Sequence, residues 1–167
     1  MTVGSSRASI TGEVCAVVES PELLINSQIE RLSPLVKESL NKMRSLEKKA
    51  EDFGRILELG ENKKAKKLLF LKRGLAKELD ETKHLRAEIS AIYKEALLLM
   101  KEKMQSVETS QKKGWEVGYG QYEETWRIWK ASSAAHIEGC RLLIDRVEEE
   151  IANIHPHILS MILGHQG

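Results

Sequence analysis

A seven-residue repeat of apolar side chains runs through most of this chain, from about residue 29 to residue 147. In a helix, such a repeat places two apolar positions of every heptad along one side, where other helices must cover them. The chain has only three prolines in 167 residues, so few positions interrupt a long helix. The repeat therefore predicts an all-α protein built from long, mutually packed helices.

The first helical region begins near residue 20. Ser20-Pro21 and Ser33-Pro34 each place a capping hydroxyl before a proline, which is typical of a helix start. We expect a short helix over 21–32 and a long one over 34–59, with a single helix kinked at Pro34 as the alternative. The two heptad sets of this region are Ile29, Val36, Met43, Ala50, Leu57 and Leu32, Ser39, Leu46, Phe53, Gly60. Gly60 is expected to end the helix in a left-handed conformation, and Asn62 to cap the next helix.

A second long helix is predicted over 63–106. Its heptad sets are Leu68, Leu75, Thr82, Ile89, Ala96 and Leu71, Glu78, Leu85, Ile92, Leu99. A helix of this length extends about 65 Å. The connection over 60–62 is so short that the two helices are expected to run antiparallel, side by side.

A third long helix is expected to begin between residues 115 and 121 and to end near 154. The glycines at 114, 118 and 120 weaken helix propensity, so residues 107–114 are predicted to form the connection. The buried row of this helix is predicted to consist of Trp115, Tyr119, Tyr122, Trp126, Trp129, Ser133, His136, Cys140, Leu143 and Val147. His155-Pro156 ends it, and the apolar segment over 157–163 is expected to form a short helix or turn.

These patterns predict an elongated antiparallel helical hairpin joined by a third long helix, a three-helix coiled-coil-like bundle with short helical pieces at the ends. The predicted organisation is a flexible segment over 1–19, the long-helix bundle over 20–155 and a short apolar turn or helix over 156–167. Several apolar residues fall outside the heptad sets: Leu69, Phe70, Leu97, Leu98 and Met100. They indicate a second contact face, with a wider core stripe as the alternative. We therefore expect self-association.

Charge is nearly balanced over the whole chain but not along it. The chain carries 26 Lys and Arg against 25 Asp and Glu, which argues against a strongly basic nucleic-acid-binding protein. Residues 61–113 carry 14 basic and 8 acidic side chains, whereas residues 114–167 carry 4 and 8. We expect the basic second helix and the acidic third helix to pair side by side.

A lysine-rich segment opens the second helix. It consists of Lys63, Lys64, Lys66, Lys67, Lys72 and Arg73. Cations at a helix N-terminus oppose the helix dipole, so the segment contributes nothing to helix stability there. A solvated outer face is the simpler interpretation, and binding of an acidic partner, anionic lipid or nucleic acid is the alternative.

Sequence motifs for catalysis are absent from the chain. It contains none of the patterns GxxxxGK[ST], GxGxxG, GxSxG, CxxC or HExxH. His136 and Cys140 lie four residues apart and could share a metal ion, with a third ligand from Cys15 or His84, but both fit the apolar row better. We predict no enzymatic activity, no cofactor, no metal site and no small-molecule substrate.

Five aromatic residues gather at the start of the third helix: Trp115, Tyr119, Tyr122, Trp126 and Trp129. Their alternating spacing of four and three favours a core cluster over an exposed stacking platform. Two cysteines do not make a disulfide framework in a chain of this size, which favours a cytoplasmic protein. The sequence thus predicts a non-catalytic structural or adaptor protein that acts through protein–protein contacts. A peripheral binder of anionic membrane or nucleic acid through Lys63–Arg73 and a small helical metal-binding protein are the alternatives.

Overall fold

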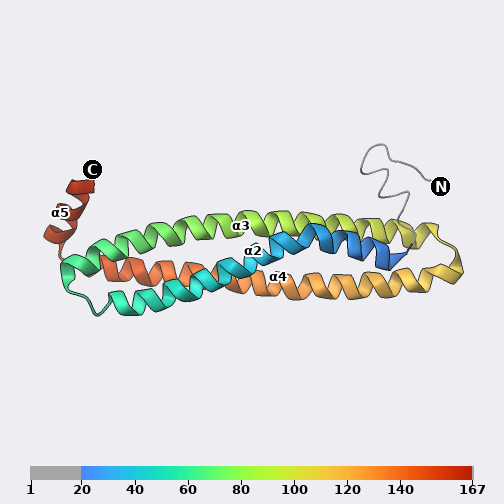
Figure 1. The fold of residues 1–167 in the computed structure, drawn as a ribbon, viewed down its shortest axis with the longest axis horizontal. Helices are drawn as coiled ribbons and strands as arrows, with labels where there is room; N and C mark the ends of the chain where they lie inside the picture. Colours follow the sequence, from blue (N-terminus) through green and yellow to red (C-terminus); the bar gives the residue numbers. More distant parts are fainter. Residues whose placement is uncertain (1–19, 167) are drawn as a thin grey trace. The chain divides into compact units, whose positions relative to one another are not determined.

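The computed structural model describes residues 20–166, and all regular secondary structure in this range is helical. The helices are α2 (Pro21–Ile56), α3 (Glu61–Ser106), α4 (Thr109–Ala152) and α5 (Pro156–Gln166) (Figure 1). The predicted all-α fold of three long packed helices and a short C-terminal helix is confirmed. The segment over 1–19, including Cys15, lies outside the described residues.

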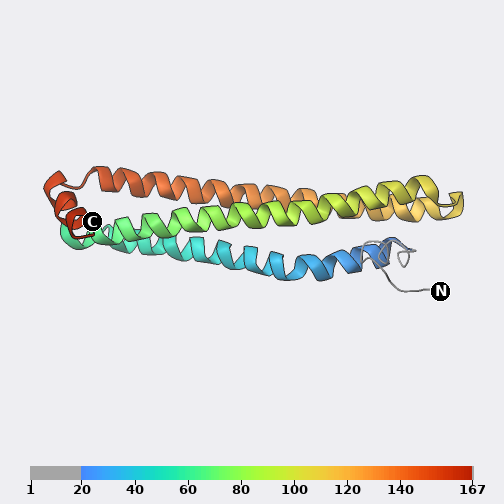
Figure 2. The ribbon, with the colours of Figure 1, turned by 90° about the horizontal axis from the view of Figure 1, so that it is seen from above.

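The described residues form two compact units, and each long helix contributes to both. Unit 1 contains residues 20–36 and 88–130, and unit 2 contains residues 37–87 and 131–166. Within each unit, α3 lies beside both α2 and α4 and runs antiparallel to them (Figures 1 and 2). Every unit therefore has its own three-helix core.

The core of unit 1 is rich in aromatic side chains. Its buried members are Leu24, Leu32, Ile89, Ile92, Tyr93, Ala96, Leu97, Met100, Trp115 and Tyr122. Trp115, with 1% of its surface exposed, is the largest fully buried side chain of the described residues. A two-residue connection, 107–108, brings the end of α3 and the start of α4 into this core.

The core of unit 2 is aliphatic at the end where α5 packs. Its buried members are Phe53, Ile56, Ala65, Leu68, Leu71, Leu75, Cys140, Leu143, Val147, Ile154 and Ile162. His155 caps α5, because its Nδ1 accepts the backbone N–H of His157 at 3.1 Å. The backbone N–H of His155 donates to Glu61 of α3 at 3.0 Å, which fixes this junction to the start of α3.

The predicted break at Pro34 is wrong, and the single-helix alternative is correct. Helix α2 continues through Pro34, which removes one backbone hydrogen bond, to the carbonyl of Glu30. Both residues are exposed, so water can satisfy that carbonyl. The helix tolerates this proline because its buried row continues on both sides of it.

The first connection also differs from the prediction. Helix α2 ends at Ile56, and residues 57–59 form tight turns in which Leu59 donates to the carbonyl of Ile56 at 3.0 Å. The backbone of Gly60 is not left-handed, so Gly60 does not end α2 in the predicted way. Its carbonyl instead accepts the N–H of Lys64 at 2.8 Å, which is the first hydrogen bond of α3. Asn62 lies inside the first turn of α3 rather than at its cap.

The start of α4 was predicted too late. The helix begins at Thr109 and includes all three glycines that were expected to delay it. The carbonyl of Glu108 accepts the N–H groups of Gln111 and Lys112 and opens the helix. Burial of Trp115 and Tyr122 outweighs the low helix propensity of these glycines.

The predicted buried rows of α3 and α4 are confirmed more fully than that of α2. Nine of the ten predicted α3 positions are buried, and only Leu99 is half-buried. In α2, Ile29 is exposed, and the row nearest the core instead contains Gln28, Leu35, Lys42, Lys49 and Ile56. The predicted α2 set that begins at Ile29 is therefore wrong by one residue, and the set that begins at Gln28, which includes two lysines, lies nearer the core.

Candidate functional site

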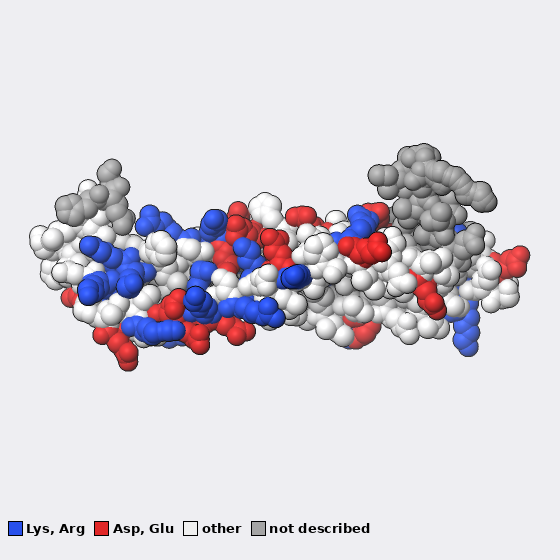
Figure 3. Space-filling model, viewed as in Figure 1, with Lys and Arg blue, Asp and Glu red and all other residues white. Residues whose placement is uncertain are grey.

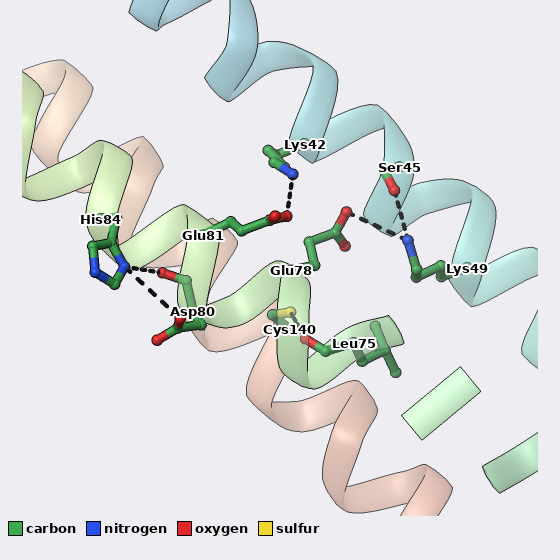
Figure 4. A network of polar contacts seen from close by, with 9 residues as sticks. All are labelled: Lys42, Ser45, Lys49, Leu75, Glu78, Asp80, Glu81, His84 and Cys140. Carbon is green, nitrogen blue, oxygen red and sulfur yellow. Dashed lines mark hydrogen bonds and ion pairs between the residues drawn. The ribbon is translucent and has the colours of Figure 1, made fainter. Parts of the chain in front are cut away.

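Polar side chains occupy the middle of the packing in unit 2. Lys42 of α2 donates to Glu81 of α3 at 2.5 Å, and this hydrogen bond lowers the pKa of Glu81 (Figure 4). Lys49 donates to Ser45 at 2.8 Å and lies 3.5 Å from Glu78. Glu78 is only 4% exposed, so this ion pair sits at the edge of the core rather than on the surface.

Helix α4 contributes His136 and Cys140 to the same region. Burial lowers the pKa of His136 and raises the pKa of the Cys140 thiol to about 11. The Cys140 thiol donates to the carbonyl of Leu75 at 3.8 Å (Figure 4), as a small buried side chain does. Neither ring nitrogen of His136 has a hydrogen-bond partner among the described residues.

The two predicted metal-ligand candidates therefore lie together, but the further ligands do not join them. His84 is exposed and its Nδ1 lies 2.9 Å from the carbonyl of Asp80 on its own helix (Figure 4). Within residues 20–166, there is no group of three or more His, Cys, Asp or Glu side chains placed to hold a metal ion. Cys15, the other candidate ligand, is outside this range.

A groove runs between α2 and α3 on unit 2 and encloses about 670 Å³. We call it the basic groove. Its lining residues are Ser45, Lys48, Lys49, Asp52, Arg55, Ile56, Leu59, Lys67, Phe70, Leu71 and Gly74. Four cations, one carboxylate and four large apolar side chains thus line the same groove. Cationic and apolar lining together suit an acidic ligand that also carries apolar groups.

Phe70 gives this groove its apolar character. It is 73% exposed, more than any other large apolar side chain of the described residues. On the floor, Gly74 leaves room for the Lys49 side chain, whose Cε would lie 3.4 Å from a Cβ at that position. Of the five apolar residues outside the heptad sets, Phe70 and Leu98 are exposed, Leu69 is half-buried, and Leu97 and Met100 are buried in the core.

The lysine-rich segment opens α3, as predicted, and faces solvent. Lys63, Lys66, Lys67 and Arg73 are exposed, whereas Lys64 and Lys72 are half-buried. Lys72 pairs with Glu148 of α4 at 3.1 Å, and Lys67 also lines the basic groove. On the face drawn in Figure 3, lysine and arginine side chains gather over unit 2.

The expected pairing of basic α3 with acidic α4 is sparse. Lys72–Glu148 is the one ion pair between these two helices in the described part of the chain. The other interhelical pairs join α2 to α3: Arg31–Glu95, Lys42–Glu81 and Lys49–Glu78. Most cations at the start of α3 and most carboxylates at the end of α4 therefore face solvent.

The predicted aromatic cluster lies in the core of unit 1. Trp115 and Tyr122 are buried, and Tyr119, Trp126 and Trp129 are half-buried against the same core. Tyr93 of α3 stacks on both Trp126 and Trp129, with ring centroids 6.0 and 6.4 Å apart. Lys130 lies over the Trp126 ring, 3.9 Å from its centroid.

Sequence reasoning identified Lys67 and Phe70 but missed the α2 side of the groove. The apolar heptad sets of α2 contain none of Lys48, Lys49 and Arg55, so they do not point to these residues. The sequence does carry a signal for this side of α2. The heptad set that lies one residue before Met43 and Ala50 contains Lys42 and Lys49, which can pair with Glu81 and Glu78 of α3.

No family model, curated protein or solved structure matches this chain. In the described range, no helix is both long and apolar enough to cross a membrane.

Proposed function

We propose that this chain is a non-catalytic helical adaptor or structural protein that binds other helices through its basic groove. The observation that carries this proposal is Phe70, whose side chain is 73% exposed beside Leu71 and Ile56 in a groove between two antiparallel helices. Grooves of this kind receive an amphipathic helix, whose apolar face covers the exposed side chains. We place this function in the cytoplasm, where a free buried thiol such as that of Cys140 is usual.

Quantitative affinity capture from the source cell tests this function. The wild-type protein is compared with a Phe70→Glu variant, and Leu98→Glu on unit 1 is the control because Leu98 is exposed outside the groove. We expect the Phe70 variant to lose captured proteins that the wild type and the control retain. Identical capture by all three proteins would refute binding through this groove.

A second candidate function is binding to an anionic surface through the lysine-rich segment. It is favoured by the exposure of Lys63, Lys66, Lys67 and Arg73 along the first turns of α3. Binding to vesicles that contain phosphatidylserine, or to duplex DNA, should then weaken steeply with salt. Replacing Lys63 and Lys66, which do not line the groove, would weaken this binding but leave helix binding intact.

A further inference from the structure

The outward side of α4 in unit 2 carries a row of exposed residues that no part of the described chain covers. This outer row consists of Ala131, Ala135, Glu138, Leu142, Asp145 and Glu149. The spacing alternates between four and three, which keeps all six on one side of the helix. They lie opposite the buried row, which includes His136, Cys140, Leu143 and Val147.

We propose that the outer row of one copy docks into the basic groove of a second copy. The proposal rests on the proposed function, because it names the helix that the groove receives. The contact would add a fourth helix to the unit-2 packing of its neighbour, with Leu142 against Phe70.

Charge supports this pairing. The groove carries Lys48, Lys49, Arg55 and Lys67 against a single Asp52, which pairs with Arg55 at 3.7 Å. The outer row carries Glu138, Asp145 and Glu149, and none of these three makes an ion pair within the described residues. Because Lys49 also pairs with Glu78, the groove cations left to meet the acidic row are Lys48 and Lys67.

Size and side-chain volume also match. The helical part of the α2 wall of the groove, from Ser45 to Ile56, is about 16 Å long, and the stretch of the outer row from Glu138 to Glu149 has the same length of about 16 Å. Leu142, 56% exposed, supplies the apolar side chain. This stretch of the row matches the helical wall of the groove in length, whereas Ala131 and Ala135 extend beyond it.

The outer row cannot reach the groove of its own chain. It points away from the core, whereas the groove is formed by α2 and α3 on the other side of that core. The contact joins two unlike surfaces, so a pair of copies keeps one free groove and one free row, and association continues into chains or rings. A contact of this length is small beside the ~1,600 Å² of a standard interface, so we expect weak association that depends on concentration.

Two complementary variants test the proposal by sedimentation velocity with intact mass determination. Phe70→Glu disables the groove but keeps the row, and Leu142→Gln disables the row but keeps the groove. Each variant alone should remain monomeric at concentrations where the wild type associates, a loss of at least about tenfold in affinity. Their equimolar mixture should form a complex of one copy of each and no larger species, because one working groove meets one working row.

The control is Leu98→Gln, an exposed apolar residue in unit 1, which should associate like the wild type. Circular dichroism checks that all variants keep their helices. Raising the salt to about 0.5 M should weaken wild-type association.

A wild type that stays monomeric, or a mixture of the two variants that does not form the one-to-one complex, would overturn the proposal. If the wild type is monomeric but its groove still captures other proteins, self-association fails while the proposed function stands; if it captures none, both fail.

Discussion

Gly118 of α4 lies directly against Pro21 of α2 in unit 1. A Cβ built on Gly118 would lie 2.7 Å from the Cβ of Pro21, closer than real side chains approach. Glycine is therefore required here by the close approach of two helices and not by a backbone turn. The first turn of α2 can pack onto α4 only because this side chain is missing.

Replacing Gly118 by Ala should destabilise the protein, although Ala is the better helix former. The clash forces α2 and α4 apart, and we expect a cost of about 1–3 kcal/mol in the free energy of unfolding. Gly114 and Gly120 are matched controls in the same helix, since nothing lies within 4 Å of a Cβ at either position. Each of those changes to Ala should stabilise by up to about 1 kcal/mol. Urea unfolding measures all three, and equal effects at the three positions would contradict the packing role of Gly118.

The three tryptophans should differ in their contribution to stability. Trp115 is fully buried, whereas Trp126 and Trp129 are half-buried. Replacing Trp115 with Ala should cost about 3–5 kcal/mol, the range for loss of a large core aromatic residue. Trp129→Ala should cost clearly less. A larger loss of unfolding free energy for Trp129→Ala than for Trp115→Ala would contradict the assignment of Trp115 as the most deeply buried tryptophan.

Tryptophan emission gives a second measurement of the same difference. Acrylamide should quench a variant that retains only Trp129 more readily than one that retains only Trp115. Equal quenching of the two variants would argue that Trp129 is as well covered as Trp115.

The heptad pattern predicts most of the fold because burial of an apolar row dominates helix packing. The α3 row was predicted almost completely, including Glu78 and Thr82, since apolar residues three and four positions away define the side of the helix on which they lie. The α2 row was displaced because Lys42 and Lys49 lie near the core and find Glu81 and Glu78 there. The sequence of α2 alone does not show that these lysines lie near the core, because that depends on which residues of α3 lie opposite them.

Local rules failed where packing overrides them. Pro34 and the glycines of α4 have low intrinsic helix propensity. Each nevertheless lies within a helix whose buried row continues past it. The candidate site was predictable only on its α3 side, since a groove depends on which residues of two separate helices face each other. Phe70 was recognised as an apolar residue outside the row, but its neighbours from α2 were not.

The lysines at the start of α3 should not contribute to stability. Changing Lys63, Lys64 and Lys66 to Gln removes cations that oppose the helix dipole, each by about 0.3–1 kcal/mol at most and less in salt. We expect an unchanged or slightly higher melting temperature. None of the three forms an ion pair in the described residues, so a clear drop in melting temperature would show that one of them is paired after all.

Stability should fall as the pH falls below the ordinary histidine pKa because of His136. Burial holds the pKa of His136 below its usual value of 6.5 in the folded protein, against an opposing effect of the Glu78 charge. Below pH 6.5 the unfolded chain takes up a proton at this position before the folded protein does. The free energy of unfolding therefore decreases as the pH is lowered through 6.5 toward the folded pKa.

Replacing His136 with Gln should remove this part of the pH dependence, measured by urea unfolding between about pH 7 and 5.5. His84→Gln is the control, because the His84 side chain is 76% exposed. A His136 variant whose stability still falls as steeply as that of the wild type would rule out His136 as the cause.

Lys49 and Glu78 form the most buried ion pair of the described residues, and single and double substitutions should affect it differently. Lys49→Met leaves the Glu78 carboxylate, 4% exposed, without its cation, and one of its oxygens already has no hydrogen-bond partner. We expect a loss of about 1–3 kcal/mol, below the ~3–5 kcal/mol of a fully buried pair because Lys49 itself is 26% exposed. Changing both residues, Lys49→Met with Glu78→Leu, removes the buried charge together with its partner and should restore or exceed wild-type stability. Urea unfolding of the two single variants and the double variant measures the coupling between the residues. If the double variant is less stable than the wild type, the pair contributes net stability relative to apolar side chains, and this polar part of the core is more than a tolerated departure from an apolar row.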